Sequence, residues 1–119
     1  MNNLVVGVLF VISIVGFRNA NPVNIPDSQL DKAVVFTSPV DNFIDVSIKS
    51  DYLPATLKNN AKFFVRILNL QGIAVYSGTK TDYKFEIFTG GLRNGDYKLS
   101  VKCSDTEILK EFKVEHKNN

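Results

Sequence analysis

Short segments of apolar residues, most of them alternating with polar ones, make up the chain after residue 32, and residues typical of turns separate them. Over residues 42–49, for example, Ile44, Val46 and Ile48 alternate with polar side chains. Because successive side chains of a strand point to opposite faces, this period of two predicts a β-strand with one buried face. We predict seven strands, over residues 33–36, 42–49, 62–70, 73–77, 83–88, 97–103 and 107–115.

The alternation also predicts which side chains form the core. Residues 62–70 carry apolar side chains on both faces, with Phe64 and Leu68 opposite the inward set, which predicts a central strand that is partly covered on its outer side. Ile108 and Leu109 are adjacent and both apolar, which predicts a bulge at the start of the last strand. The expected inward residues are Ile44, Val46, Ile48, Phe63, Val65, Ile67, Tyr83, Phe85, Ile87, Tyr97, Leu99, Val101, Cys103, Phe112 and Val114.

The strand pattern predicts the fold class. Seven short strands with turn residues between them, and no helical period of useful length, are typical of an antiparallel β-sandwich. We therefore expect an all-β, immunoglobulin-like sandwich, with an up-and-down barrel as the second choice. The order of strands along the chain does not distinguish Greek-key from meander connections. Residues 50–60, which contain Pro54, are predicted to be a loop that packs Tyr52, Leu53 and Leu57 against a sheet edge.

Residues 90–101 provide the most specific fold signal. This stretch is rich in Gly and Asn, which tolerate positive φ, and it leads into the alternating strand that contains Tyr97. The spacing of Leu92, Gly95 and Tyr97 is similar to that of a tyrosine corner, in which a Tyr hydroxyl bonds to the backbone a few residues upstream. We predict that Tyr97 fixes the start of this strand.

The N-terminal part of the chain is predicted to direct export. Residues 4–17 form an unbroken apolar run of the length found in signal peptides and too short for a comfortable membrane span. We assign residues 1–20 to a signal peptide, with cleavage after Gly16 and an uncleaved anchor as alternatives. Residues 21–32, with two prolines and no periodicity, are predicted to be a flexible tether. The sandwich then spans residues 33–116, and residues 117–119 form a frayed tail.

If the signal peptide is removed, we expect no membrane span and a location in the periplasm, on the cell surface or outside the cell. The formal net charge of +2 is nearly balanced. Because Lys and Glu are interspersed and no basic stripe is present, nucleic acid is not an expected partner. Cys103 is the only cysteine, so the chain cannot form an internal disulfide. Pairing between molecules is one fate for this thiol, and a place in the core as a small apolar residue is the favoured one.

Candidate catalytic and metal-binding groups are sparse. The only histidine, His116, lies near the C-terminus, and Cys103 is predicted to face inward, which argues against a nucleophile and base acting together. A structural zinc site needs four Cys or His ligands, and Cys103 and His116 are the only Cys and His residues in the sequence. Asp41, Asp45 and Asp51 lack the spacing of a calcium loop, so we interpret them as solvated turn and strand residues. We expect no enzyme activity and no cofactor.

One predicted surface stands out. If the two central strands pair, Phe64, Arg66 and Leu68 lie on the outer face of the sheet beside Lys98 and Lys102. A face that mixes apolar and basic side chains is typical of an interaction surface for a protein or cell-surface partner. The alternative is that the loop at residues 50–60 or the N-terminal tether covers it.

Three blocks of the sequence resemble a known pattern. Residues 38–40, 65–75 and 92–101 are similar to the strand and hairpin elements of type IX secretion C-terminal sorting domains. The same blocks resemble a group of small exported Bacteroidota proteins of unknown function, each made of a signal peptide and one immunoglobulin-like domain. Ser38 and Asn69 depart from the sorting pattern, which has Asn and often Asp at these positions.

The resemblance implies an immunoglobulin-like fold in which Gly72, Leu92, Gly95 and Tyr97 have structural roles. It carries no catalytic or ligand-binding residue to this chain. Because only a short segment precedes the predicted sandwich, we expect a stand-alone exported module that binds a protein or surface, with a sorting or anchoring domain as the alternative.

Overall fold

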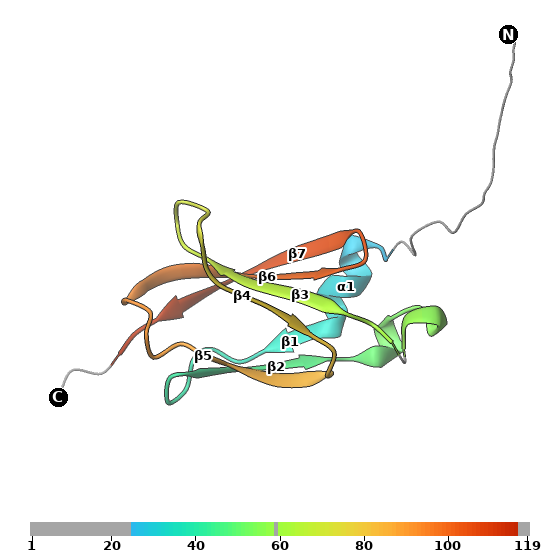
Figure 1. Ribbon diagram of the computed structural model, residues 1–119, viewed down its shortest axis with the longest axis horizontal. Helices are drawn as coiled ribbons and strands as arrows, with labels where there is room; N and C mark the ends of the chain where they lie inside the picture. The colour runs from blue at the N-terminus through green and yellow to red at the C-terminus, as the bar shows by residue number, and fades with distance from the viewer. Residues whose placement is uncertain (1–24, 59, 117–119) are drawn as a thin grey trace, which may run out of the picture.

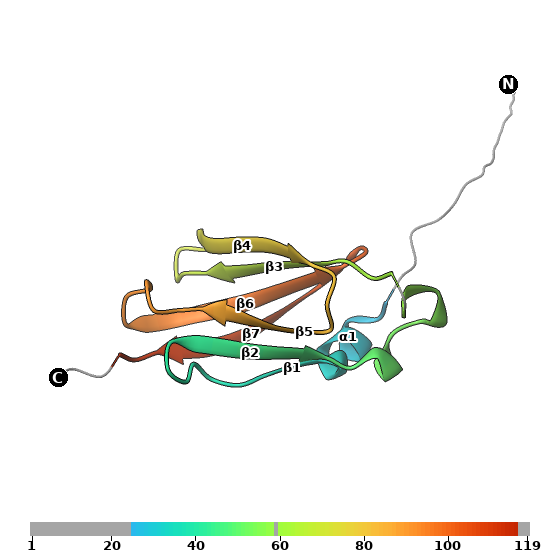
Figure 2. The same ribbon diagram turned by 60° about the horizontal axis from the view of Figure 1, so that its bottom comes forward.

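Two antiparallel sheets pack face to face in the computed structural model, which describes residues 25–58 and 60–116 (Figures 1 and 2). The predicted signal peptide at residues 1–20 and the predicted tail at residues 117–119 lie outside the described residues. The smaller sheet, sheet A, has the order β1(Val34–Phe36), β2(Phe43–Ile48), β5(Lys84–Phe88). Sheet B has the order β4(Ala74–Lys80), β3(Phe63–Leu68), β6(Gly95–Cys103), β7(Thr106–Val114). The predicted all-β class and the seven strands are confirmed.

The connections show which of the predicted topologies is present. β1–β2, β3–β4 and β6–β7 are consecutive pairs within one sheet, whereas the chain changes sheet between β2 and β3, between β4 and β5, and between β5 and β6. As a result β5 pairs with β2, and β6 pairs with β3. Crossed connections of this kind belong to an immunoglobulin-like sandwich, whereas an up-and-down barrel pairs consecutive strands around a closed sheet.

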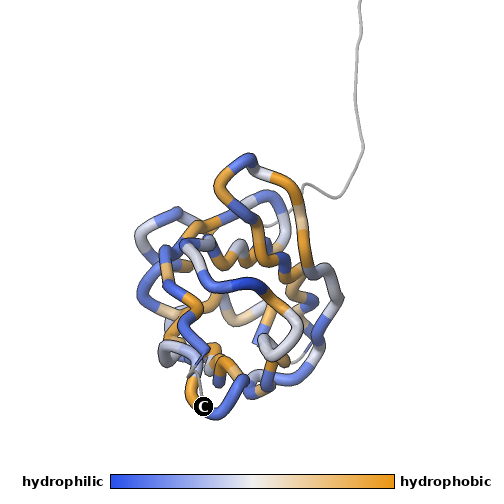
Figure 3. The backbone as a smooth tube through the Cα atoms, turned by 90° about the vertical axis from the view of Figure 1, so that its left-hand side faces the viewer, coloured by the Kyte–Doolittle hydropathy of each residue, from blue (hydrophilic) through white to orange (hydrophobic). Residues whose placement is uncertain are grey.

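The inward faces of both sheets form one core. Alternate residues of β2 and β3 are buried, as are Leu99, Val101 and Cys103 of β6. Figure 3 shows hydrophobic (orange) and hydrophilic (blue) stretches following one another along the backbone. Tyr83 and Phe85, which were predicted to face inward, are only half-buried, because Phe85 lies in the edge strand β5 and Tyr83 directly precedes it. The largest fully buried side chains include Phe63, Leu30, Ile44, Ile67, Ile87 and Leu99.

The flexible tether predicted for residues 21–32 is wrong where the structure describes it. Residues Asp27–Ala33 form helix α1, in which Leu30 and Ala33 are completely buried. These two side chains join the core between the sheets, so the helix is held by apolar packing. A helix of seven residues is too short to show a clear 3.6-residue period in the sequence, which is why the pattern did not reveal it.

Polar contacts also fix α1 to strand β7. The buried Thr106 hydroxyl donates to the Ile25 carbonyl oxygen. Lys110 Nζ donates to the Asp31 carbonyl oxygen at 3.0 Å and lies 3.4 Å from the Asp31 carboxylate. The segment before β1 is therefore part of the folded domain.

Two smaller predictions are also corrected. β7 keeps regular alternation, with Ile108 buried and Leu109 50% exposed, so the predicted bulge is absent there because Leu109 simply faces outward. The register shift lies instead between Ile67 and Leu68, opposite β4. In the loop between β2 and β3, which contains the 3-10 helices η1(Ser50–Tyr52) and η2(Ala55–Leu57), Leu53 is buried and Tyr52 is exposed, because the two neighbouring side chains point in different directions.

Strand β4 is an edge of sheet B, and it ends in an inward-facing charge. Lys80 pairs with the fully buried Phe63, and its ammonium group lies 5.9 Å and 5.6 Å from the ring centres of Tyr76 and Phe85. The cation therefore rests on aromatic faces at the edge of the core.

Candidate functional site

The outer face of sheet B brings together the five residues predicted as an interaction face. Phe64 and Arg66 of β3 lie opposite Lys102 and Ser100 of β6, and Leu68 lies opposite Lys98. Phe64 is 42% exposed, Arg66 and Leu68 are half-buried, and both lysines are exposed. We call this surface the outer face of sheet B.

The described parts of the two segments that were considered as covers for this face place their buried apolar side chains elsewhere. Leu53 of the loop after β2 and Leu30 of α1 both belong to the core between the two sheets. These two side chains therefore pack in the core and do not cover the outer face of sheet B, on which Phe64 is exposed.

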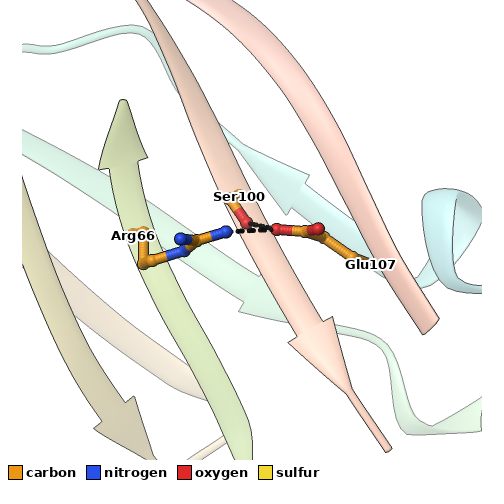
Figure 4. Close-up of polar contacts among 3 residues, drawn as sticks. All are labelled: Arg66, Ser100 and Glu107. Carbon is orange, nitrogen blue, oxygen red and sulfur yellow. Dashed lines mark hydrogen bonds and ion pairs between the residues drawn. The ribbon is translucent and has the colours of Figure 1, made fainter. Parts of the chain in front are cut away.

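A polar cluster crosses three strands at the centre of the outer face (Figure 4). Arg66 Nη2 donates to Glu107 Oε2 at 2.8 Å, and the Ser100 hydroxyl donates to the same oxygen. The Ser100 hydrogen bond, followed by that of Arg66, holds the pKa of Glu107 below its usual range. The Arg66 guanidinium also lies 5.6 Å from the ring centre of Phe64.

This cluster has the properties of a structural ion pair. Ser100 is completely buried and donates its proton to a carboxylate, so it is not placed to attack a substrate. Glu107, with its lowered pKa, is a weak base at neutral pH. The alternation of apolar and polar residues does not reveal this cluster, because the cluster depends on the strand register that sets Arg66 beside Ser100.

A groove of about 610 Å³ extends the outer face toward the β3–β4 hairpin. Its apolar wall includes Leu68, Leu70 and Leu109, of which Leu70 is 74% and Leu109 50% exposed. Four charged side chains of both signs line the rest of it: Asp96, Lys98, Glu111 and Lys113. The sequence did not show that Leu109 lies on the surface. Its neighbour Ile108 is also apolar, so the alternation leaves open which of the two side chains faces the core.

Two of the residues predicted as structural, Gly72 and Tyr97, line this groove. The Tyr97 hydroxyl donates to the Arg93 carbonyl oxygen at 2.7 Å, four residues upstream, and its ring stacks on Phe112. This is the geometry of a tyrosine corner. Leu92 packs against the core, and Gly95 begins β6 with a φ of +155°.

Gly72 lies in the β3–β4 turn with a φ of +80°, a conformation that favours glycine. The Asn69 side-chain oxygen accepts hydrogen bonds from the backbone N–H groups of Gln71 and Ile73. Asn69, which departs from the sorting-domain pattern, thus organises this turn.

Cys103 and His116 are far apart in the sandwich. Cys103 pairs with Thr106 at one end of the β6–β7 hairpin, whereas His116 follows the other end, where Gly95 pairs with Val114. Burial raises the pKa of the Cys103 thiol, which makes it a poor nucleophile. Within the described residues no group of three or more His, Cys, Asp or Glu side chains is arranged to hold a metal ion.

His116 is tied to two loops. Its backbone N–H donates to Asn94 Oδ1 at 2.7 Å, and its Nε2 donates to the Leu92 carbonyl oxygen at 2.5 Å. Its Nδ1 lies 3.2 Å from Asn42 Oδ1. The end of the sandwich is therefore ordered up to this residue.

Comparison with known proteins shows the fold. The chain is similar to the crystal structure of a DUF3244 family protein with an immunoglobulin-like β-sandwich fold from Bacteroides vulgatus, with a TM-score of 0.56 and 13% identity over 70% of this chain and 84% of that one. It is also similar to domains d3–d4 of the rat CD45 extracellular region, with a TM-score of 0.54 and 16% identity over 68% of this chain and 46% of that one.

No family model and no curated protein matches the chain. At these identities the two solved structures show an immunoglobulin-like fold and nothing finer. None of the helices in the part of the chain that the structure describes is long and apolar enough to cross a membrane.

Proposed function

We propose that this protein is a non-enzymatic, exported β-sandwich module that binds a protein partner through the outer face of sheet B. The observation that carries the proposal is the exposure of apolar side chains on that one face and its adjoining hairpin. Phe64, Leu70, Ile73, Val75 and Leu109 are between 41% and 74% exposed. Clusters of exposed apolar residues with a polar rim are typical of protein interaction sites.

The charges on the face indicate the chemistry of the partner. Within the described residues, Lys98 and Lys102 are exposed and form no ion pair, although each lies opposite a glutamate of β7, Glu111 and Glu107. A partner that places apolar side chains in the groove beside Leu68 and Leu109, and acidic groups beside these lysines, would match both features. The charges on the rim would then set the orientation and association rate more than the affinity.

Substitution of the apolar residues tests this proposal. Affinity enrichment with the wild-type protein should recover a partner that the Phe64→Ser/Leu68→Ser variant loses, with thermal unfolding of both proteins recorded. Phe43→Ser is the matched control, because Phe43 is a 40% exposed phenyl ring on sheet A. The partner must then bind in purified form, with at least about tenfold weaker affinity for the double variant. Equal recovery by all three proteins would reject the proposal.

Export is supported by the apolar run at residues 4–17. Cell fractionation with intact-mass analysis tests it: we expect a mature form that begins near residues 18–21 in an exported fraction. A form that retains Met1 and partitions with the membrane would contradict cleavage.

Delivery to the cell surface as a sorting domain is the second proposal. It is supported by the resemblance of residues 38–40, 65–75 and 92–101 to type IX sorting domains, and by the turn at Gly72 and the tyrosine corner at Tyr97, which lie in two of these blocks. Fusion of the chain to a passenger protein in a type IX-competent bacterium should then bring the passenger to the surface. A passenger that stays in the periplasm would reject this role.

A further inference from the structure

The charged side chains that line the groove on sheet B form a checkerboard. Asp96 of β6 lies directly opposite Lys113 of β7, and Lys98 of β6 lies directly opposite Glu111 of β7. The sign of the charge therefore alternates both along each strand and across the pair. All four side chains are exposed, and the ion pairs formed by the described residues involve none of them. Their charges are thus available to another molecule.

A checkerboard of charges is complementary to a copy of itself. Suppose that a second copy is turned by a half-rotation about an axis that runs along the strands between β6 and β7. Its β7 then lies over β6 of the first copy, so that its Glu111 faces Lys98 and its Lys113 faces Asp96. Because the axis is two-fold, both contacts occur again in the opposite direction.

The apolar walls of the groove fit the same arrangement. β6 lies between β3 and β7 in sheet B, so Leu68 and Leu70 line one side of the groove and Leu109 lines the other. The β7 strand of a second copy would enter between these walls and place its own Leu109 beside Leu68. Leu70 is 74% and Leu109 50% exposed, and covering them removes apolar surface from water, which favours association.

The pattern of charges distinguishes this face from the outer face of sheet A. On sheet B the pair next to Leu109 also joins opposite signs, since Lys102 lies opposite Glu107. On sheet A, Asp45 lies opposite Glu86. The same half-rotation about an axis between β2 and β5 would bring the carboxylates of two copies together, and like charges in this position repel. Only the face on sheet B is self-complementary by charge.

From these observations we infer that the partner of the outer face of sheet B is a second copy of this chain, bound as a two-fold dimer in which β7 of each copy lies over β6 of the other. The inference rests on the proposed function, because it names the partner of the same surface. A two-fold contact uses the same surface on both copies, so assembly stops at the dimer.

The size of the face indicates a weak dimer. The longest strands of the four-stranded sheet have nine residues. At about 4.8 Å between strands and about 3.4 Å per residue, the face covers at most roughly 600 Å². This is below the about 800 Å² that each partner of a standard interface buries. We therefore expect a dissociation constant of about 10–100 µM, which is typical of a transient complex.

Exchange of the facing charges tests the dimer in the protein as its cells produce it. Sedimentation velocity of the purified wild type over about 1–500 µM should show a monomer–dimer equilibrium. Lys98→Glu and Glu111→Lys should each weaken it at least about tenfold, because each change places like charges together on both sides of the axis. Lys84→Glu and Glu86→Lys, the same changes at exposed positions of β5, are the matched controls and should leave it unchanged.

A mixture of the two single variants makes the test specific for the two-fold contact. In a mixed dimer, the carboxylate introduced at position 98 of one chain faces the ammonium group introduced at position 111 of the other. The native Lys98 and Glu111 still face each other on the other side of the axis. The equimolar mixture and the double variant Lys98→Glu/Glu111→Lys should therefore both recover the wild-type affinity within about threefold. Leu109→Ser, which removes the apolar contact, should weaken the dimer at least about tenfold in either charge background.

A protein that remains monomeric at every concentration would overturn the inference. It would also be overturned by a dimer that persists unchanged in both single variants, or by one that neither the mixture nor the double variant restores. These results are distinguishable from a failure of the proposed function. If the chain is monomeric and affinity enrichment still recovers a different protein that Phe64→Ser/Leu68→Ser loses, the dimer is rejected and the binding role of the face is retained.

Discussion

Tyr97 joins the start of β6 to the loop before it through one hydrogen bond, from its hydroxyl to the Arg93 carbonyl oxygen. Because Tyr97 is only half-buried, removal of the hydroxyl should cost about 0.5–1.5 kcal/mol, the usual net value of one such bond. We expect Tyr97→Phe to lower the urea midpoint accordingly. Tyr52→Phe, a change at an exposed tyrosine, is the control. An unchanged midpoint in Tyr97→Phe would contradict the role of the corner.

Glu107 makes stability depend on pH. Hydrogen bonds from Ser100 and Arg66 lower the pKa of this carboxyl in the folded protein, so the unfolded chain takes up its proton more readily. The stabilisation is therefore present above the ordinary pKa of Glu and is lost as the pH falls through the lower folded value.

Glu107→Gln should therefore destabilise the protein at pH 7, by no more than about 1 kcal/mol because the ion pair is partly exposed, and by less at pH 3. Urea unfolding at the two pH values measures this difference. Glu111→Gln, on the exposed face of the same strand, is the control. A loss that is equal at both pH values would show that the effect does not come from the charge of Glu107.

At the level of elements, helix α1 closes part of the core with a single large side chain. Leu30 is completely buried between the sheets, so Leu30→Ala should cost about 2–5 kcal/mol, the range for leucine truncation in a core. Chemical denaturation measures the loss, with the exposed Gln29→Ala as control. A loss below about 1 kcal/mol would show that the helix contributes little to the domain.

The strands were predictable and the helix was not, for a physical reason. Period-two alternation is visible in six residues, so β2 and β3 are clear from Ile44 to Ile48 and from Phe63 to Ile67. A helix of seven residues shows at most two apolar positions on its buried face, here Leu30 and Ala33, and two prolines precede it. Alternation also predicted the outer face of sheet B.

The polar cluster at the centre of the outer face of sheet B depends on the pairing of strands, which no local sequence pattern contains. The Arg66–Glu107 ion pair joins strands that are 41 residues apart along the chain.

At the level of the whole molecule, Cys103 reports on global unfolding. The residue is 1% exposed, burial raises the pKa of its thiol, and its strand is paired on both sides by β3 and β7. The native protein at neutral pH should therefore react with Ellman's reagent only at the rate of unfolding, whereas the protein in urea reacts at once. Rapid labelling of the native protein, or a disulfide-linked dimer under non-reducing conditions, would contradict this burial.

The inward-facing Lys80 at the end of β4 affects how copies of this protein behave when they are crowded together. An edge strand offers unpaired backbone groups to which the strand of another molecule can add, and this is a common first step in aggregation. Lys80 lies over the rings of Tyr76 and Phe85, so a strand that paired along this edge would bury an ammonium group in an apolar seam. The same side chain that completes the edge of the core thus keeps the sheet from growing, which favours a discrete, non-fibrillar protein at high concentration.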